Sequence, residues 1–194
     1  MVLAAAGGVN HDELVKLAEK YFGDLKTGYS GEIPIIEPCR YTGSEIRVRD
    51  DDIPLAHIAI AVEGTSWSDA DTIPLMVAST LIGSWDRTMA NGGSIGSKLA
   101  QKSSSLNLCH SFQAFNTCYA DTGLWGCYFT TDKMLIDDFL LHLHNEWMRL
   151  CTSVTEFEVQ RAKNLLRTNM LLQLDGTTPI CEEIGRFVIL IEKK

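Results

Sequence analysis

The strongest alternation of apolar and polar residues lies in the stretch Leu106–Thr130. In its first part Leu106, Leu108, Phe112 and Ala114 fall on one face, and polar residues stand between them. A period of two is typical of a β-strand with one buried face. The pattern therefore predicts the first arm of an antiparallel hairpin.

The second arm follows a turn at Ala120–Gly123, where an aspartate can bond its own backbone and a glycine tolerates a positive φ. Leu124–Phe129 is apolar on both sides, as in a strand that is covered on both faces. A hairpin of this length needs further strands or a helical cover to be stable. We expect the segments that follow it to supply helices.

Upstream of the hairpin, Val2–Val9 is typical of a buried strand. Asn10 and Glu13 form a variant of the capping box that begins a helix, and Gly23 ends it. Helical spacing predicts a buried face on this helix, made of Leu14, Leu17, Ala18 and Tyr21.

Four further segments precede the hairpin. Glu45–Arg49 alternates, and Leu55–Glu63 is typical of a buried strand. A helix is expected over Asp71–Ile82, with Pro74 tolerated in its first turn, and a short helix over Ser97–Gln101.

Three helices are expected after the hairpin. The first covers Lys133–Leu150, and Thr155 and Glu158 form a capping box that opens the second, which runs to Asp175. The third begins at Pro179, with Glu182 and Glu183 in its first turn. The apolar side of the first helix consists of Ile136, Leu140, Leu143, Trp147 and Leu150.

These elements predict an α+β fold, an antiparallel sheet with helices packed on one face. Lys26–Thr42 contains several glycine and proline residues and little periodicity, so it is the expected linker. The expected organisation is therefore a strand and helix over residues 1–25, a linker over 26–42 and a larger domain over 43–194.

Charge and composition exclude some functions. The net charge is −8 and no run of basic residues occurs, which argues against nucleic-acid binding. No apolar stretch approaches the length that spans a bilayer. The 6 cysteines form no C-x-x-C pair, and we expect them to be buried thiols in a reducing compartment.

Metal binding has one candidate pair, His142 and Glu146, which lie one helical turn apart. A zinc site needs further ligands, and neither H-x-x-E-H nor H-E-x-x-H occurs, so we interpret the pair as part of a solvated helix face. His57 and His110 lie within apolar strands, where a hydrogen-bonded core or interface histidine is expected.

Nucleophilic and phosphate-binding motifs are absent as well. The sequence has no G-x-S-x-G elbow, and Gly92, Gly93 and Gly96 lack the spacing of a P-loop. We interpret these glycines as a loop, with substrate contact as the alternative. The acidic groups Asp50–Asp52 and Glu182–Glu183 are expected to be solvated, with attraction of basic peptides as a second role. The residues by themselves thus predict no catalytic, metal or cofactor-binding site.

Several longer runs of the sequence resemble one known family: VLAAAGGV-x-H, GSEIRVRDD, PLAHIAIAVE, LCHSFQAFNT, DTGLWG, EWMRLCTSVTE-x-EV and NMLLQLDGTTPICEEIGR. They resemble the pitrilysin-type zinc metallopeptidases. Within that family they resemble the β subunits of the mitochondrial processing peptidase and the core 1 subunits of the cytochrome reductase complex (respiratory complex III). The resemblance covers residues 1 to about 186, and LCHSFQAFNT and TNMLLQLDG favour the processing-peptidase branch.

The resemblance implies two similar α+β domains per subunit. The family's zinc motif belongs to the first domain, upstream of Val2–Val9, so no catalytic or zinc-binding residue of the family is expected in this chain. Residues 1–25 would be the last strand and helix of the zinc domain, and 43–194 the second, non-catalytic domain. Phe187–Lys194 departs from the family pattern, and the final helix and strand are expected to be missing. A chain with such an unpaired edge is expected to be marginally stable.

The function that the resemblance implies is that of a fragment of the processing-peptidase β subunit, a zinc endopeptidase that removes N-terminal targeting presequences. The fragment would be inactive alone. Its expected partners are the processing-peptidase α subunit, in a heterodimer, and presequence peptides in the intact enzyme. The alternatives are a core 1 scaffold subunit with respiratory complex III partners, or a truncated product without its own function. The expected location is mitochondrial, in the matrix or on the matrix side of the inner membrane.

Overall fold

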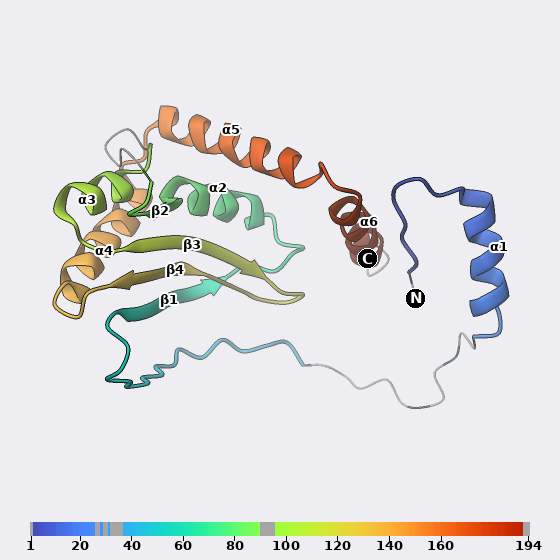
Figure 1. Cartoon of the computed structure of the whole chain (residues 1–194), viewed down its shortest axis with the longest axis horizontal. Helices are drawn as coiled ribbons and strands as arrows, with labels where there is room; N and C mark the ends of the chain where they lie inside the picture. Colours follow the sequence, from blue (N-terminus) through green and yellow to red (C-terminus); the bar gives the residue numbers. More distant parts are fainter. Residues whose placement is uncertain (1, 26–27, 29–30, 32–36, 90–95, 192–194) are drawn as a thin grey trace. The chain divides into compact units, whose positions relative to one another are not determined.

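The computed structural model describes residues 2–25, 28, 31, 37–89 and 96–191 (Figure 1). It forms two compact units, one of Met1–Glu37 with Arg167–Lys194 and the other of Pro38–Leu166. Much of the expected linker, at 26–27, 29–30 and 32–36, lies outside the described residues. The domain boundaries expected from the sequence stay predictions, and the two units are described separately.

The larger unit contains a 4-stranded antiparallel sheet with the strand order β1-β4-β3-β2. Helices pack on one side of this sheet (Figure 1), which confirms the predicted α+β class. Its elements are β1 (Ala56–Gly64), α2 (Thr72–Ile82), β2 (Ser84–Asp86), α3 (Lys98–Leu106), β3 (Ser111–Cys118), β4 (Gly123–Thr131) and α4 (Ile136–Thr152). Helix α5 (Glu156–Gln173) begins in this unit and ends in the other.

The core lies between the sheet and its helices. Phe139 of α4 packs on Phe129 of β4, with ring centroids 4.3 Å apart, and on Phe112 of β3, at 5.9 Å. All three rings are fully buried. The neighbouring strands and helices complete the cluster with Ile82, Trp85, Leu99, Ala100, Leu108, Cys109, Trp125, Cys127 and Leu143.

The predicted hairpin is confirmed as β3 and β4, with one correction at its start. Leu106 is the last residue of α3 and is 55% exposed, so it does not belong to the strand face. Asn107 ends α3 with a left-handed φ of 52°, a conformation that asparagine tolerates. The chain reverses there, and β3 begins only at Ser111.

Strand β4 was expected to be covered on both faces, and the structure confirms this for one of them. Trp125, Cys127 and Phe129 are buried against the helices, whereas Tyr128 on the opposite face is 40% exposed. The apolar run therefore reflects one full core face and one partly covered face.

Helix signals near the sheet are confirmed. Helix α2 begins directly after Asp71. At the start of α5, Thr155 and Glu158 form the predicted capping box. The backbone N–H of Thr155 donates to the side chain of Glu158 at 3.1 Å, and the backbone N–H of Glu158 donates to the side chain of Thr155 at 3.3 Å. Ser97 caps α3 and donates a hydrogen bond to Ile82 O at 2.7 Å, which ties α3 to the end of α2.

The alternating segment Glu45–Arg49 does not form a strand in the structure. Both of its apolar side chains, Ile46 and Val48, are 88% exposed.

The smaller unit begins with an irregular segment instead of the strand predicted at Val2–Val9, because no described strand pairs with it. This segment packs along α6 (Thr177–Ile191): Cys181 donates a hydrogen bond to Ala4 O at 3.0 Å, and Gly7, at a φ of 119°, lies against Thr177. Helix α6 begins at Thr177, before Pro179. Glu182 and Glu183, which were expected in its first turn, therefore lie after that turn.

Helix α1 (His11–Phe22) begins at Asn10 and ends at Gly23, as predicted. The side chain of Asn10 accepts hydrogen bonds from the backbone N–H groups of Asp12 and Glu13. The predicted burial of its apolar face is wrong, because no residue of α1 is buried and Tyr21 is 68% exposed.

Gly126 gives a test of the sheet packing. A Cβ added there would meet Ile60 O at 2.1 Å and the ring of Phe115 at 2.9 Å, and the strand backbone cannot yield. We predict that Gly126→Ala lowers the free energy of unfolding by about 2 kcal/mol, measured by chemical denaturation. The control is Gly43→Ala, which has open space around it and should change stability by less than about 0.5 kcal/mol. Equal stability of the two variants would contradict the packing.

Candidate functional site

The candidate metal pair, His142 and Glu146, does not form a metal site. Glu146 is 3% exposed and its carboxylate is held by Arg149, whose Nη2 lies 2.6 Å from Oε1. The Nδ1 atom of His142 is buried without a hydrogen-bond partner among the described residues. In the part of the chain that the structure describes, no group of three or more His, Cys, Asp or Glu residues could hold a metal ion. The interpretation of Glu146 as part of a solvated face is wrong, because it lies in a buried ion-pair network.

This network joins three helices. Arg149 of α4 bonds Glu146 on its own helix and Glu158 of α5 at 3.1 Å, and Lys98 of α3 lies 3.2 Å from Glu158. Burial alone raises the pKa of Glu158, but hydrogen bonds from Thr155, Lys98 and Arg149 outweigh it and hold the pKa at about 2. The hydrogen bond to Glu146 raises the pKa of Arg149. The network therefore stabilises the helix layer and offers no free ligand.

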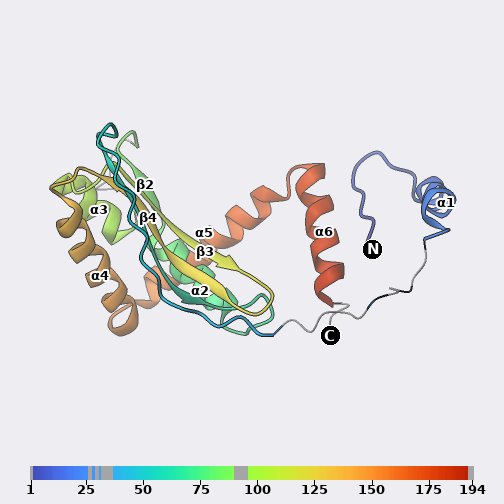
Figure 2. The same cartoon turned by 90° about the horizontal axis from the view of Figure 1, so that it is seen from below.

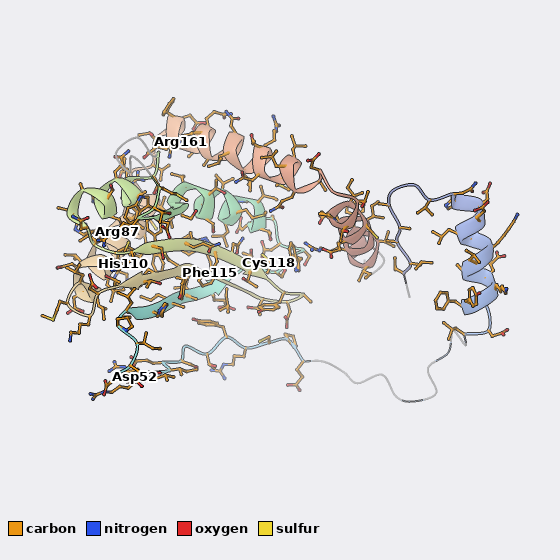
Figure 3. The ribbon with its side chains drawn as sticks, viewed as in Figure 1. Asp52, Arg87, His110, Phe115, Cys118 and Arg161 are labelled. Atoms are coloured by element: carbon orange, nitrogen blue, oxygen red, sulfur yellow. The ribbon has the colours of Figure 1, made fainter. Side chains whose placement is uncertain are left out.

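A second polar cluster lies at one end of β3. His110 Nδ1 is 3.5 Å from Arg87 Nη1, and His110 Nε2 is 3.4 Å from Asp132 Oδ1 (Figure 3). Hydrogen bonds from the backbone and side chain of Thr88 lower the pKa of nearby Asp86. The prediction of a hydrogen-bonded histidine is confirmed for His110. The cluster contains no nucleophile and links the strand ends through hydrogen bonds.

The register of the strands defines the side of the sheet that faces away from the helices. We call it the open face. It consists of His57, Ala59, Ala61 and Glu63 of β1, Ser111, Gln113, Phe115 and Thr117 of β3, and Leu124, Gly126, Tyr128 and Thr130 of β4. Figure 2 views the unit from below, where the segment that precedes β1 runs beside the sheet.

Aromatic and polar side chains meet on the open face. His57 Nδ1 lies 2.6 Å from the hydroxyl of Tyr128 and 3.3 Å from Oγ1 of Thr130. The ring of Phe115 lies across Gly126, where no side chain intervenes. The hydrogen bonds confirm the expectation for His57, which lies on this face and not in the core. Such a mixture of aromatic and polar groups suits binding to another protein surface.

The cysteines offer no reactive thiol in the core. Burial raises the pKa of Cys109 to about 11 and that of Cys127 to about 12, so neither forms a thiolate at neutral pH. Cys118 is also buried, near the far end of β3. The expectation of six buried thiols is wrong for Cys39 and Cys151, which are exposed, and Cys181 is only partly buried.

The remaining residues that the sequence singled out are two acidic groups and a set of glycines. Asp50–Asp52 and Glu182–Glu183 are exposed, as expected, whereas Gly92 and Gly93 lie outside the described residues. Gly96 is described, and the guanidinium of Arg161 occupies the space where its side chain would be. In the described part of the chain, no helix is long and apolar enough to cross a membrane.

Comparisons with known proteins agree on one family. The family model "Peptidase M16 inactive domain" matches residues 1–166. The β subunit of the mitochondrial-processing peptidase of Bos taurus is 60% identical over 194 residues, 100% of this chain and 40% of the relative. Subunit 1 of the cytochrome b-c1 complex of Homo sapiens is 52% identical over 190 residues, 97% of this chain and 40% of the relative.

A solved chain of complex III2 from Candida albicans has a TM-score of 0.84 at 31% identity, covering 95% of this chain and 43% of that chain. The chain thus spans 40% of the length of these two curated relatives. The alignment with the bovine relative covers the whole chain, beyond Arg186, where the resemblance was expected to end.

The buried network predicts a pH-dependent stability. The pKa of Glu158 is about 2 in the folded state and 4.5 without the fold, so its contribution is complete above pH 4.5 and is lost as the pH falls towards 2. We predict that Glu158→Ala lowers the unfolding free energy at neutral pH by about 3 kcal/mol, because it removes the partner of Lys98 and one of the two carboxylates that bond Arg149. The difference in unfolding free energy between the parent chain and the variant should become smaller as the pH falls. Urea titrations at several pH values measure it, with the exposed Glu156→Ala as control. A loss that is independent of pH would contradict the assignment.

Proposed function

The chain belongs to the M16 peptidase family, whose inactive-domain model it matches, and on that premise we propose that it is a non-catalytic component of a processing-peptidase assembly. The observation that carries the proposal is the identity of 60% to the bovine β subunit over every residue of the chain. The relatives are mitochondrial proteins by their names. We place the chain in the matrix or on the matrix side of the inner membrane.

The role that we propose is to bind an α-type subunit in a heterodimer and, in the complete enzyme, to help enclose a presequence peptide. In this family zinc polarises the scissile carbonyl. The described residues do not fit a zinc ion, because Glu146 is engaged by Arg149 and no third ligand lies beside His142. The chain therefore contributes binding surface and no hydrolytic step.

The open face supplies the contact in this proposal. Tyr128 presents an exposed ring that is anchored by its hydroxyl to His57, and Phe115 stands on the neighbouring strand. Rigid aromatic side chains with a polar tip are enriched at the centres of protein interfaces. The register of the sheet fixes their positions before binding, which lowers the entropic cost of association.

The second candidate is a scaffold subunit of respiratory complex III. It is supported by the identity of 52% to subunit 1 of the human cytochrome b-c1 complex and by the match to a chain of complex III2. The two candidates share the fold and differ in the partner, so partner choice separates them.

Co-purification tests the proposal. The tagged chain is expressed with a processing-peptidase α subunit, and separately in mitochondria that contain complex III. We predict a stoichiometric complex with the α subunit, which Tyr128→Ala weakens by roughly tenfold because an interface anchor is lost.

The control is Tyr119→Ala, which removes an exposed tyrosine of the hairpin turn, outside the strands that form the open face, and should leave binding unchanged. Recovery with cytochromes instead of the α subunit would support the scaffold candidate and contradict the proposal. Failure to bind either partner would contradict both. Equal loss in the two tyrosine variants would contradict the placement on the open face.

A further inference from the structure

The outer side of β1 faces a segment of the chain itself. Residues 38–52, which we call the strap, precede β1 and run antiparallel beside it (Figures 1 and 2). The strap belongs to the larger unit, yet each of its residues is exposed and none of them forms a helix or strand. The strap is therefore an extended segment that lies along the end strand of the sheet.

Both ends of the strap are fixed. At its start, the N–H of Cys39 donates to Oδ2 of Asp121 at 2.6 Å. The hydroxyl of Tyr41 then donates to Ala61 O at 3.4 Å. At its end, a hydrogen bond of 3.1 Å between side chain and backbone holds the turn Asp50–Asp52, which reverses the chain towards β1. Anchors at both ends lower the entropic cost of ordering the residues between them.

The middle of the strap, residues 42–49, has no backbone hydrogen bond to β1 among the described residues. Its side chains alternate. Arg47 forms an ion pair with Glu45, two positions away, whereas Ile46 and Val48 stand next to these charged residues and are 88% exposed. A period of two with β-branched residues on one side is typical of a strand with one apolar face. The middle of the strap thus has the pattern of a strand without its pairing.

Strand β1 offers groups that match this pattern. A Cβ added at Gly126 of β4 would clash with Ile60 O, so that carbonyl points towards β4. Backbone groups of successive residues point to opposite sides of a strand, so those of Ala59 and Ala61 point towards the strap, as the tyrosine contact also indicates. On the helix side, Ile58 and Ile60 are half-buried at the margin of the core. Both features suit a further strand.

We propose that residues 43–49 close onto β1 and form a fifth strand of the sheet. Odd-numbered strap residues then stand opposite odd-numbered residues of β1, so the backbone groups of Glu45 meet the outward groups of the strand. The same register places Ile46 and Val48 on the helix side, where they extend the apolar layer. A shift by one residue would turn these two side chains to the open face and the charged ones to the core.

Closure covers the end strand of the sheet. An uncovered strand of this length is a template for strands of other molecules, and the strap of the same chain occupies that place first. Glu45 and Arg47 come to lie at the rim of the open face, beside His57. The proposal concerns the conformation of this chain and is independent of the proposed α-type partner.

Hydrogen exchange at β1 tests the closure. In the parent chain, the amides of Ala59 and Ala61 should exchange roughly tenfold or more slower than in an unstructured peptide, because closure pairs them. The amide of Ile60, which points towards β4, should be slow in every folded variant and serves as the internal check. Nuclear magnetic resonance resolves the three amides.

Two matched pairs of variants test the register. Glu45→Pro removes an N–H that closure directs to β1, whereas Ser44→Pro removes one that points away, so only Glu45→Pro should abolish the protection of Ala59. Ile46→Ser should reduce this protection about fivefold, because the apolar contact of the closed strap is lost. Its control, Arg47→Ser, changes the charged side of the strap and should retain the protection.

Loss of protection in Glu45→Pro and Ile46→Ser, with retention in both controls, supports the strap as a strand. Three outcomes overturn the proposal. The first is exchange of Ala59 and Ala61 in the parent chain as fast as in an unstructured peptide. The second is equal protection in all four variants, because it would then come from contacts other than the strap. The third is loss in Ser44→Pro without loss in Glu45→Pro.

Discussion

The packing of Phe139 against Phe112 and Phe129 is the contact on which the larger unit depends. These three rings join α4 to the two central strands, and none is exposed to solvent. Because they all lie on one side of the sheet, burial of apolar area there commits the helices to that side. The opposite side is left as the open face, and β1 is an end strand of the described sheet.

The second constraint is electrostatic. The carboxylates of Glu146 and Glu158 are buried, and such charges are tolerated only with close partners. Arg149 supplies a partner for both, and Lys98 brings α3 to the same point. The network gives the helix layer a fixed arrangement that apolar packing alone does not specify. It also engages the carboxylate of Glu146, one member of the i, i+4 pair on α4.

Local signals in the sequence predicted many of the helix and turn boundaries in both units. The turn before Gly123, the cap at Asn10 and the capping box at Thr155 depend on residues within a few positions, so a single sequence contains them. Val2–Val9 was predicted wrongly because apolar content alone cannot show whether a strand partner exists. Glu158 was recognised as a cap, but its burial depends on Lys98 and Arg149, which come from other elements. No spacing rule reveals such a contact.

Candidate chemistry could be examined in the sequence by motif spacing, which matched no known zinc or nucleophile pattern. Surfaces leave no such local signal. The open face could not be foreseen in detail, because the neighbours of His57 and Phe115 depend on the register between strands. Once that register is known, the open face can be defined residue by residue, and it is the surface on which the proposed role depends.

Hydrolysis of a presequence peptide by the purified chain tests this account most directly. The peptide is incubated with the chain, with and without added zinc, and cleavage is followed by mass spectrometry. The account predicts a rate equal to that of the peptide alone under both conditions. Cleavage that co-elutes with the chain, stops with a chelator and is lost in His142→Ala would contradict it.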